Sequence, residues 1–387
     1  MTSEASVGAN AAGPSRRPHA VVIGSGFGGL AAAVRLGARG FRVTVLERLD
    51  APGGRAYVFR QDGFSFDAGP TIITAPQLFE ELWTLCGRKM SDDIDLRLMD
   101  PFYQIRFDDG RVFDYCGDRA RVKAEVAKFN PADLAGYDRF MKASEGVFNV
   151  GFEKLSRMPF DNVLDMLKVV PEMVRHRSYR SVYTFSDEYL SDPALKTVFN
   201  FHPLLIGGNP YSVTSVYSLI SYLEQRYGIH YAMGGMGALV KGLVGLVEGQ
   251  GSTIRYKTHV EKILVEGARA VGVRLADGEE IRADIVVSNV DSATTYNRLL
   301  GDQTRFRWTD ERIEMCQSSM SLFVWYFGTK RRYDDVKHHT ILLGPRYRGL
   351  LMDIFDKKVL ADDFSLYLYR PTATDPSLAP PGCDTFY

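Results

Sequence analysis

The 387-residue sequence lacks the features that mark metal-binding, disulfide-rich and membrane-spanning proteins. Cysteine is rare and shows no CxxC or Cys/His spacing of a zinc site; the four cysteines are Cys86, Cys116, Cys316 and Cys383. They are also too few for the disulfide framework of a small secreted domain. No run reaches the roughly 18 uncharged apolar residues of a spanning helix. We therefore expect reduced thiols, no metal and no transmembrane segment.

An excess of charge of either sign is also absent, because 47 basic residues balance 47 acidic ones. This balance argues against a general nucleic-acid binder. A hydrophobic fraction of 45% and a charged fraction of 24% are ordinary for a globular protein, and the length favours two domains. Residues 1–18 are mostly small and polar, and we expect them to form a disordered tail.

The most informative motif in the sequence is a glycine-rich stretch near the N-terminus. Ala20–Ile23 is a short apolar run of strand-forming residues, and a glycine-rich turn follows it. Leu30–Arg39 has a helical pattern that ends at Gly40, and Phe41–Leu46 is a second candidate strand. The order of strand, glycine turn, helix and strand predicts a dinucleotide-binding unit. A plain glycine turn is the alternative.

Each residue type in this stretch suits a pyrophosphate ligand. Gly24 allows the tight turn out of the strand, and Gly26 lets a phosphate approach the backbone because it has no Cβ. Gly29 allows close packing of helix against strand, and the helix N-terminus offers N–H groups to the phosphates. Glu47 ends the second strand, where an acid can bind ribose hydroxyls.

A second glycine pair narrows the choice of nucleotide. Gly53, Gly54 and Arg55 follow Glu47 closely, and this spacing suits a loop that folds back over the pyrophosphate. Nicotinamide-binding domains do not need such a loop. The stretch is similar to the start of two-dinucleotide-binding flavoproteins, so FAD is favoured over NAD.

The rest of the chain predicts an α/β protein whose nucleotide domain is discontinuous. A mostly helical region is followed from Thr253 by period-two strands and a buried strand near residue 285, which indicates a return to the first domain. We expect a Rossmann-like FAD domain from 19–95 and 230–300. An inserted α+β domain for substrate and membrane association would take in 96–229 and 301–387.

Two parts of the inserted domain leave alternatives open. Residues 147–176 combine an apolar face with interleaved basic residues, which describes either a helix in a membrane interface or a core-facing helix. Near the C-terminus, 322–327, 339–343 and 364–369 are strand candidates. Residues 383–387 look like the start of another strand, so we interpret the sequence as C-terminally truncated.

Several motifs together resemble the bacterial phytoene desaturases, the FAD-dependent Crt-type carotenoid desaturases, over nearly the whole chain from Ala20 onward. The motifs are VVIGSGFGGLAAAVRL, ERLDAPGGRAY, GFSFDAGPTIIT, LLIGGNP, YAMGGMGALV, LFVWYFG, HHTILLGPRY and DFSLYLYRPT. Several of them are not general to flavoproteins. One departure is that family members continue with a second glycine-rich stretch that closes the FAD domain.

The resemblance implies a set of FAD-binding residues. They are Gly24, Gly26, Gly29, Glu47, Arg48, Gly54 and Arg55, with Gly69, Pro70 and Thr71 beside the flavin ring and Val260 at the adenine end. A structural turn is the alternative interpretation of Gly69–Thr71.

The resemblance also implies the reaction and its surroundings. We expect desaturation of 15-cis-phytoene to neurosporene or lycopene, with oxygen or a quinone as electron acceptor, in a cytoplasmic protein held peripherally at the cell membrane. The alternatives are a related polyene flavoenzyme (a C30 desaturase, isomerase or saturase) and an inactive, FAD-poor fragment. The many aromatic residues, 23 Phe, 20 Tyr and 3 Trp, suit an apolar substrate channel but equally an ordinary core.

The residue that receives the proton is harder to identify. Asp165 lies beside an apolar stripe, and the family resemblance implies an acid at this position. The alternative is a solvated helix face, because Lys168 lies three residues further on. His202, His338 and His339 are weaker candidates, for which we expect structural roles.

Overall fold

The computed structural model describes residues 17–159, 162–301, 308–316 and 318–387. The expected disordered tail therefore lies outside the described residues except for Arg17 and Pro18. The chain forms two compact units, which we describe separately. The first takes in Met1–Tyr57, Glu81–Lys89 and Val240–Met315, and the second Val58–Glu80, Met90–Leu239 and Cys316–Tyr387.

The first unit is built on a parallel sheet with the strand order β13-β1-β2-β9. The strands are β1 (His19–Ile23), β2 (Arg42–Leu46), β9 (Thr253–Arg255) and β13 (Ile285–Ser288). All five residues of β1 are buried, as expected for a central parallel strand rich in β-branched residues. The pairing of β1 with β13 confirms the predicted return of the chain to this sheet.

Helix α1 (Phe27–Ala38) connects β1 to β2, and its buried residues are small or aliphatic. A three-stranded antiparallel meander follows β9, with β10 (Val260–Glu266), β11 (Arg269–Leu275) and β12 (Glu280–Arg282). Short helices α10 (Ser292–Thr294) and α11 (Asp310–Glu314) come after β13. Helices α2 (Pro76–Leu85) and α9 (Met236–Gly249) have residues in both units.

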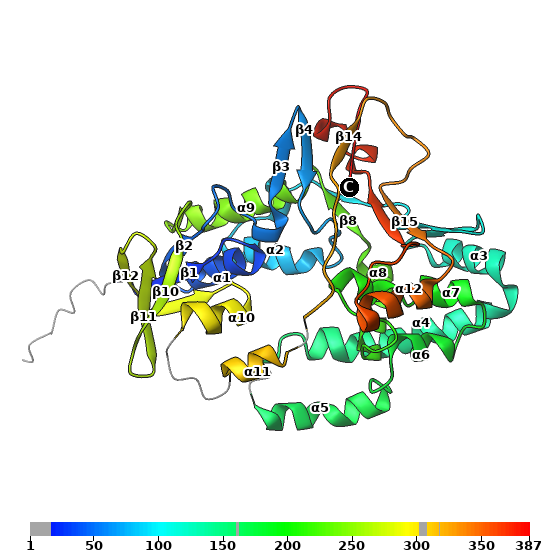
Figure 1. The fold of residues 1–387 in the computed structure, drawn as a ribbon, viewed down its shortest axis with the longest axis horizontal. Coiled ribbons are helices and arrows are strands. Elements are labelled where there is room, and N and C mark those ends of the chain that lie inside the picture. The colour runs from blue at the N-terminus through cyan, green and yellow to red at the C-terminus, as the bar shows by residue number, and fades with distance from the viewer. Residues whose placement is uncertain (1–16, 160–161, 302–307, 317) are drawn as a thin grey trace, which may run out of the picture. The chain divides into compact units, whose positions relative to one another are not determined.

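The second unit contains a mixed sheet, smaller sheets and most of the helices (Figure 1). The mixed sheet has the order β16-β15-β6-β7, formed by β6 (Tyr103–Phe107), β7 (Val112–Tyr115), β15 (His339–Leu343) and β16 (Leu366–Tyr369). Two-stranded pairs are β3 (Val58–Gln61) with β4 (Phe64–Asp67), β5 (Leu96–Leu98) with β8 (His230–Ala232), and β14 (Phe327–Thr329) with β17 (Asp384–Phe386).

Seven helices of the second unit are α3 (Arg119–Phe129), α4 (Leu134–Phe148), α5 (Val163–Arg175), α6 (Val182–Asp187), α7 (Pro193–Val198), α8 (Leu219–Tyr227) and α12 (Tyr347–Met352). The six helices from α3 to α8 confirm the predicted helical region, whereas α12 lies later in the chain. None of the helices in the described ranges is both long and apolar enough to cross a membrane.

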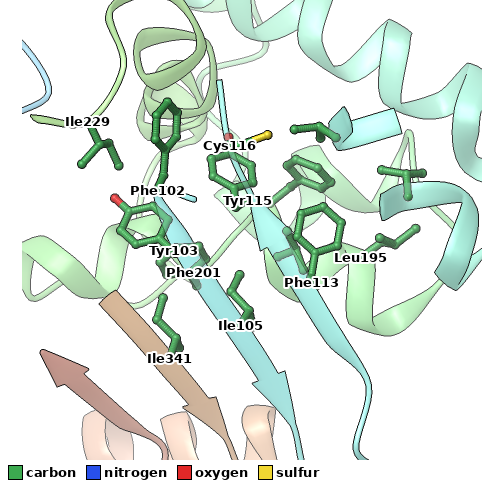
Figure 2. Close-up of a cluster of buried hydrophobic side chains, with 14 of the residues drawn as sticks. Phe102, Tyr103, Ile105, Phe113, Tyr115, Cys116, Leu195, Phe201, Ile229 and Ile341 are labelled. Carbon is green, nitrogen blue, oxygen red and sulfur yellow. The ribbon is translucent and has the colours of Figure 1, made fainter. Parts of the chain in front are cut away.

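Aromatic side chains form the core between β6, β7 and these helices (Figure 2). The rings of Phe113 and Phe199 meet edge to face with centroids 6.0 Å apart, and Tyr103 and Phe201 do so at 5.6 Å. Such edge contacts place the positive rim of one ring against the negative face of the other. Many of the aromatic residues noted in the sequence are therefore core residues.

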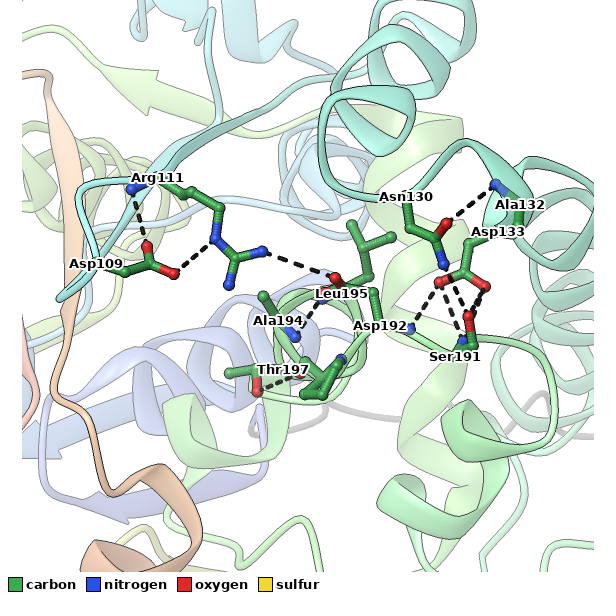
Figure 3. Close-up of polar contacts among 11 residues, drawn as sticks. Asp109, Arg111, Asn130, Ala132, Asp133, Ser191, Asp192, Ala194, Leu195 and Thr197 are labelled. Atoms are coloured by element: carbon green, nitrogen blue, oxygen red, sulfur yellow. Dashed lines mark hydrogen bonds and ion pairs between the residues drawn. The ribbon is translucent and has the colours of Figure 1, made fainter.

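A buried carboxylate joins two helical segments of the second unit (Figure 3). Asp133 accepts hydrogen bonds from the backbone N–H of Ser191, the Ser191 hydroxyl and the backbone N–H of Asp192, at 2.9, 2.7 and 2.9 Å. Asp192 in turn caps α7 through the N–H groups of Ala194 and Leu195. These hydrogen bonds replace the ones to water that the carboxylate loses when it is buried.

One strand differs from its prediction. The run 322–327 was expected to form a strand, but the observed strand β14 begins only at Phe327 and pairs with β17 over three residues. A run of strand-forming residues still needs a backbone partner to form a strand. The side chains of Leu322, Phe323 and Trp325 are instead exposed. The predicted strand at 383–387 is confirmed as β17, which pairs with β14.

Candidate functional site

The glycine turn after β1 leaves no room for side chains. Gly24 has a φ of +91°, which favours glycine, and a Cβ on Gly29 would lie 2.0 Å from the Gly24 carbonyl oxygen. The N-cap of α1 is Gly26, which makes no side-chain capping bond to the first turn. The N–H groups of that turn are thus not used by a side-chain cap and can bind a ligand.

The second glycine pair, Gly53–Gly54, lies against the glycine turn that follows β1. Gly53 donates its N–H to the Ser25 carbonyl at 3.0 Å, and Gly26 and Gly53 form an isolated parallel bridge. Gly53 and Gly54 have φ values of +116° and +57°, and a Cβ on Gly54 would lie 3.3 Å from the Gly26 Cα. The two glycine segments together form one backbone surface, which we name the glycine surface.

Glu47 is buried at the end of β2 and is held by this turn. Its Oε2 accepts the N–H of Ser25 at 2.8 Å and the Ser25 hydroxyl at 2.6 Å. Its Oε1 accepts the N–H of Leu49 at 2.9 Å. Because a carboxylate oxygen can accept two hydrogen bonds, Oε1 keeps capacity for a ligand hydroxyl.

Ser25 and Asn289 contribute to the site although neither was predicted from the sequence. The Asn289 side chain lies so close to the turn that a Cβ on Gly28 would meet its Oδ1 at 2.5 Å, and one on Gly26 its Nδ2 at 3.0 Å. Asn289 directly follows β13, the neighbour of β1. Its place at the carboxyl end of an adjacent parallel strand is the signal that could have identified it.

The remaining predicted residues of the first unit differ in exposure. Arg48 and Arg55 are exposed. Val260 is buried in a hydrophobic cluster that includes Ile23 of β1 and Leu46 of β2, so its side chain belongs to the core of the first unit. A contact of Val260 with the adenine end of a nucleotide stays a prediction.

Gly69, Pro70 and Thr71 lie in the second unit, directly after β4. Thr71 is buried, and its hydroxyl lies 2.9 Å from the hydroxyl of Tyr367. The Gly69 carbonyl accepts a hydrogen bond from the Tyr387 hydroxyl at 2.8 Å. This segment is therefore held by side chains from distant parts of the sequence.

Asp67 precedes this segment and has an unusual environment. Burial raises the pKa of its carboxyl to about 6, although hydrogen bonds from the N–H of Met236 and the hydroxyl of Tyr369 oppose the shift. The Met236 N–H lies 3.0 Å from Asp67 Oδ1, so the acid also binds the start of α9.

Asp165 lies in the first turn of α5. Its Oδ1 forms an ion pair with Lys168 at 2.8 Å, and its Oδ2 accepts a hydrogen bond from the Asn162 amide at 2.6 Å. The hydrogen bond from Lys168 lowers the pKa of the Asp165 carboxyl. The ion pair is the one that the alternative interpretation anticipates, and the catalytic role of Asp165 stays a prediction.

The three histidines are buried among aromatic rings. His202 lies 3.2 Å from Glu224, which also accepts the hydroxyl of Tyr103 at 2.8 Å. Burial lowers the pKa of His338 and of His339 well below the ordinary value of 6.5. The two rings are therefore neutral at physiological pH.

Comparison with known proteins identifies the family. Residues 27–376 match the family model described as flavin containing amine oxidoreductase. The chain is 50% identical over 371 residues to the neurosporene-forming phytoene desaturase of Cereibacter sphaeroides, covering 95% of this chain and 72% of that protein. It is 46% identical over 367 residues to the lycopene-forming phytoene desaturase of Pseudescherichia vulneris, covering 95% and 75%.

The chain belongs to the phytoene desaturase family. As a phytoene desaturase family member it is an oxidoreductase whose cofactor is FAD. Solved structures agree on the fold: an oxidoreductase from Methanosarcina mazei aligns with a TM-score of 0.63 at 19% identity, covering 95% of this chain and 78% of that one. Putrescine oxidase aligns with a TM-score of 0.60 at 15% identity, covering 96% and 75%.

The first unit fits the FAD of a phytoene desaturase family member. A bare glycine surface, an uncapped helix N-terminus and a buried acid with a free acceptor position suit a pyrophosphate and a ribose. A Cβ at Gly26, Gly28 or Gly29 would displace Asn289 or the backbone from this surface. The donor set is that of a nucleotide rather than of a metal.

Proposed function

We propose that this chain catalyses the FAD-dependent desaturation of 15-cis-phytoene to neurosporene or lycopene. The observation that carries the proposal is identity of 46 to 50% with desaturases that form these products, over 95% of the chain. A C30 substrate is less well supported, because the 4,4'-diapophytoene desaturase of Methylomonas is 30% identical.

The residues of the first unit would bind the nucleotide part of FAD. The backbone N–H groups at the start of α1 bind the pyrophosphate, and Glu47 accepts a ribose hydroxyl at Oε1. Arg48, Gly54 and Arg55 line the second glycine segment, where Arg55 offers a positive charge to the phosphates. The flavin, when bound, supplies the hydride-accepting position that the reaction needs.

The substrate gives the protein no charge to bind, since phytoene is a hydrocarbon. Binding must therefore come from apolar surface, and orientation from the shape of the site. A cavity of about 480 Å³ in the second unit does not suit this task, because charged side chains such as Arg119, Asp138 and Glu145 line it. A hydrocarbon of this kind resides in lipid, so the enzyme has to meet a membrane.

Helix α5 supports a membrane-facing role. On one side, Leu164, Leu167 and Val174 are 69%, 58% and 59% exposed, whereas Val169 on the opposite side is 8% exposed. The basic side chains of Lys168 and Arg175 flank the exposed apolar row, at 69% and 76% exposure. An apolar row with flanking cations matches the apolar interior and anionic headgroups of a lipid surface.

The reaction is tested with purified chain, excess FAD and phytoene in liposomes. We expect a bound-flavin absorbance spectrum and the stepwise appearance of the visible bands of neurosporene or lycopene. Retention of FAD without conversion of phytoene, but with conversion of a C30 analogue or isomerisation of a polyene, would instead support a related polyene enzyme. Assays under oxygen and under argon with a quinone identify the electron acceptor.

The membrane surface is tested by co-sedimentation with anionic vesicles. Changing Leu164, Leu167 and Val174 together to Gln should lower vesicle binding by about tenfold or more, because each exposed aliphatic chain loses its transfer into lipid. Leu98→Gln is the matched control, since Leu98 is 63% exposed but lies on β5. Equal binding of the triple variant and the control would rule out α5 as the membrane surface.

Asp165 is proposed as the group that receives the substrate proton. Asp165→Asn should then lower kcat by about 10²-fold with little change in thermal stability. Lys168→Gln removes the partner of the ion pair but no base, so its kcat should fall far less. Similar, small falls in kcat in both variants would contradict this role. Asp165 would then only form hydrogen bonds in the first turn of α5.

A further inference from the structure

Four tyrosine hydroxyls bind one short segment of the second unit. The segment runs from Asp67 to Thr71, and we name its partners the tyrosine cluster. The contacts are Tyr369 with Asp67 Oδ2 at 3.3 Å, Tyr326 with the Ala68 carbonyl at 2.7 Å, Tyr387 with the Gly69 carbonyl at 2.8 Å and Tyr367 with Thr71 Oγ1 at 2.9 Å. The tyrosines come from positions about 260 to 320 residues further along the chain.

These contacts replace the backbone hydrogen bonds that an irregular segment cannot obtain from a sheet. Beyond β4 the strand pairing has ended, so the carbonyl groups of Ala68 and Gly69 depend on side-chain donors. Pro70 fixes its own φ and donates no hydrogen bond. The segment's conformation is therefore set by where the hydroxyls lie.

The tyrosine cluster is itself well anchored. Tyr387 and Tyr369 exchange backbone hydrogen bonds at 3.1 and 2.8 Å, and their rings lie 4.9 Å apart. The ring of Tyr387 also contacts those of Tyr326 and Tyr367, at 5.6 and 6.0 Å. Burial raises the pKa of Tyr367, Tyr369 and Tyr387, so these phenols remain protonated donors.

A buried histidine completes the cluster. His339 Nδ1 lies 2.6 Å from the Tyr367 hydroxyl, and the imidazole stacks nearly parallel on Tyr367 and Tyr369, with interplanar angles of 19° and 16°. The Tyr367 hydroxyl has one hydrogen and two neighbours, Thr71 and His339. The tautomer of His339 therefore decides whether Tyr367 donates to Thr71 or accepts from it.

We propose that Tyr326, Tyr367 and Tyr387 are positioning residues that hold Ala68–Thr71 against the flavin ring, and that His339 fixes the direction of the Tyr367 hydroxyl. This inference rests on the proposed function and on the family resemblance, which implies that Gly69, Pro70 and Thr71 lie beside that ring. The backbone segment then presents its groups to the flavin in one fixed arrangement. A shift of this segment would change the polarity around the flavin without removing a group that touches the nucleotide part.

The test uses the FAD-loaded full chain and tyrosine-to-phenylalanine changes, which remove a hydroxyl and keep the ring. The double variant Tyr326→Phe/Tyr387→Phe should shift the flavin visible band and redox potential and weaken FAD binding by about tenfold. kcat should fall while KM for phytoene changes little. Tyr222→Phe is the matched control, because it removes a hydroxyl that donates to Glu145 at 2.8 Å elsewhere in the second unit.

The histidine is tested by His339→Phe, which keeps a stacked ring and removes Nδ1. We expect a flavin band shift like that of Tyr367→Phe. His338→Phe is the control, because His338 Nδ1 contacts Thr374 at 2.7 Å instead of Tyr367.

The outcomes separate this inference from the proposed function. An unchanged flavin spectrum and FAD affinity in the double variant would overturn the positioning role, whatever happens to thermal stability. A wild-type chain that binds FAD but ignores phytoene, while the double variant still shifts the spectrum, would overturn the function and leave the positioning role standing. A wild-type chain that retains no FAD overturns both.

Discussion

The glycine surface of the first unit and the tyrosine cluster of the second unit differ in the kind of group that makes their contacts. The glycine surface is made of backbone from residues 24–29 and 53–54, close together in sequence. The tyrosine cluster is made of side chains that reach back across most of the chain to residues 67–71. The first leaves no space for a Cβ at Gly28, Gly29 or Gly53, whereas the second depends on single hydroxyl groups.

The strongest way to break the glycine surface is to add one methyl group. In Gly29→Ala the Cβ would lie 2.0 Å from the Gly24 carbonyl oxygen, so helix and strand must separate. We expect loss of FAD and a fall of about 3 kcal/mol in the free energy of unfolding. Gly245→Ala in α9 is the control, because its Cβ meets nothing within 4 Å. Thermal unfolding and flavin absorbance measure both, and equal effects would contradict the account.

A side-chain network in the second unit should also fail when one partner is lost. Asp133→Ala leaves the N–H groups of Ser191 and Asp192 without their acceptor, at a cost of about 2 to 3 kcal/mol. The half-buried Asp138→Ala, which loses ion pairs with Arg119 and Lys123, should cost less than about 1 kcal/mol. Chemical denaturation compares the two, and a larger loss for Asp138→Ala would be inconsistent with the network.

The same carboxylate gives a pH test. Burial alone would raise the pKa of Asp133, but hydrogen bonds from Asp192 and Ser191 outweigh it and hold the pKa below the ordinary value of 3.8. A depressed pKa means that this stabilisation is present above about pH 4 and is lost as the pH falls further. Wild type should therefore lose its advantage over Asp133→Asn in acid.

Asp67, at the base of the tyrosine cluster, has the opposite pH dependence. Its pKa is raised from 3.8 to about 6, so its stabilising contribution is present below about pH 4 and is lost as the pH rises through about 6. The shift corresponds to about 2 to 3 kcal/mol. Asp67→Asn cannot ionise and should show a flatter unfolding free energy between pH 4 and 7. Parallel curves for wild type and variant would exclude the raised pKa.

The variant with the smallest expected effect tests the role of Glu47 in the first unit. Glu47→Gln keeps an oxygen to accept from Ser25 but removes the charge and places an NH2 where Oε1 accepts the Leu49 N–H, so FAD binding should weaken by about tenfold and the melting temperature should fall moderately. Glu261→Gln, an exposed acid paired with Arg274, is the control for lost charge in the same unit. Titration of the apoprotein with FAD measures both. An unaffected affinity in Glu47→Gln would exclude a ribose contact.

The contrast also explains how far the sequence could predict the structure. The strand, turn and helix around Gly24–Gly29 were predictable because the steric demands act between neighbours in sequence. The parallel return through β13 was predictable from its short apolar run after the period-two strands. Local chemistry carried these predictions.

What the sequence did not predict depends on distant partners. Asn289 is an ordinary residue until β13 lies next to β1, and the hydroxyls of Tyr326 and Tyr387 have no local signal that points to Ala68 and Gly69. Residues 322–326 form a continuous run of strand-forming apolar and aromatic residues but have no paired strand in the described structure. Pairing and hydrogen bonding over long separations are set by the whole fold, not by the segment.

The most direct test of the account is a single-turnover reaction in the absence of oxygen. FAD-loaded chain is mixed with phytoene liposomes, and the flavin and carotenoid bands are followed in the same cuvette. We predict that the oxidised flavin band bleaches at the same rate as conjugated carotenoid appears, with one double bond formed per flavin reduced. Bound flavin that stays oxidised in the presence of phytoene, with no carotenoid formed, would contradict the assignment of this chain as a desaturase.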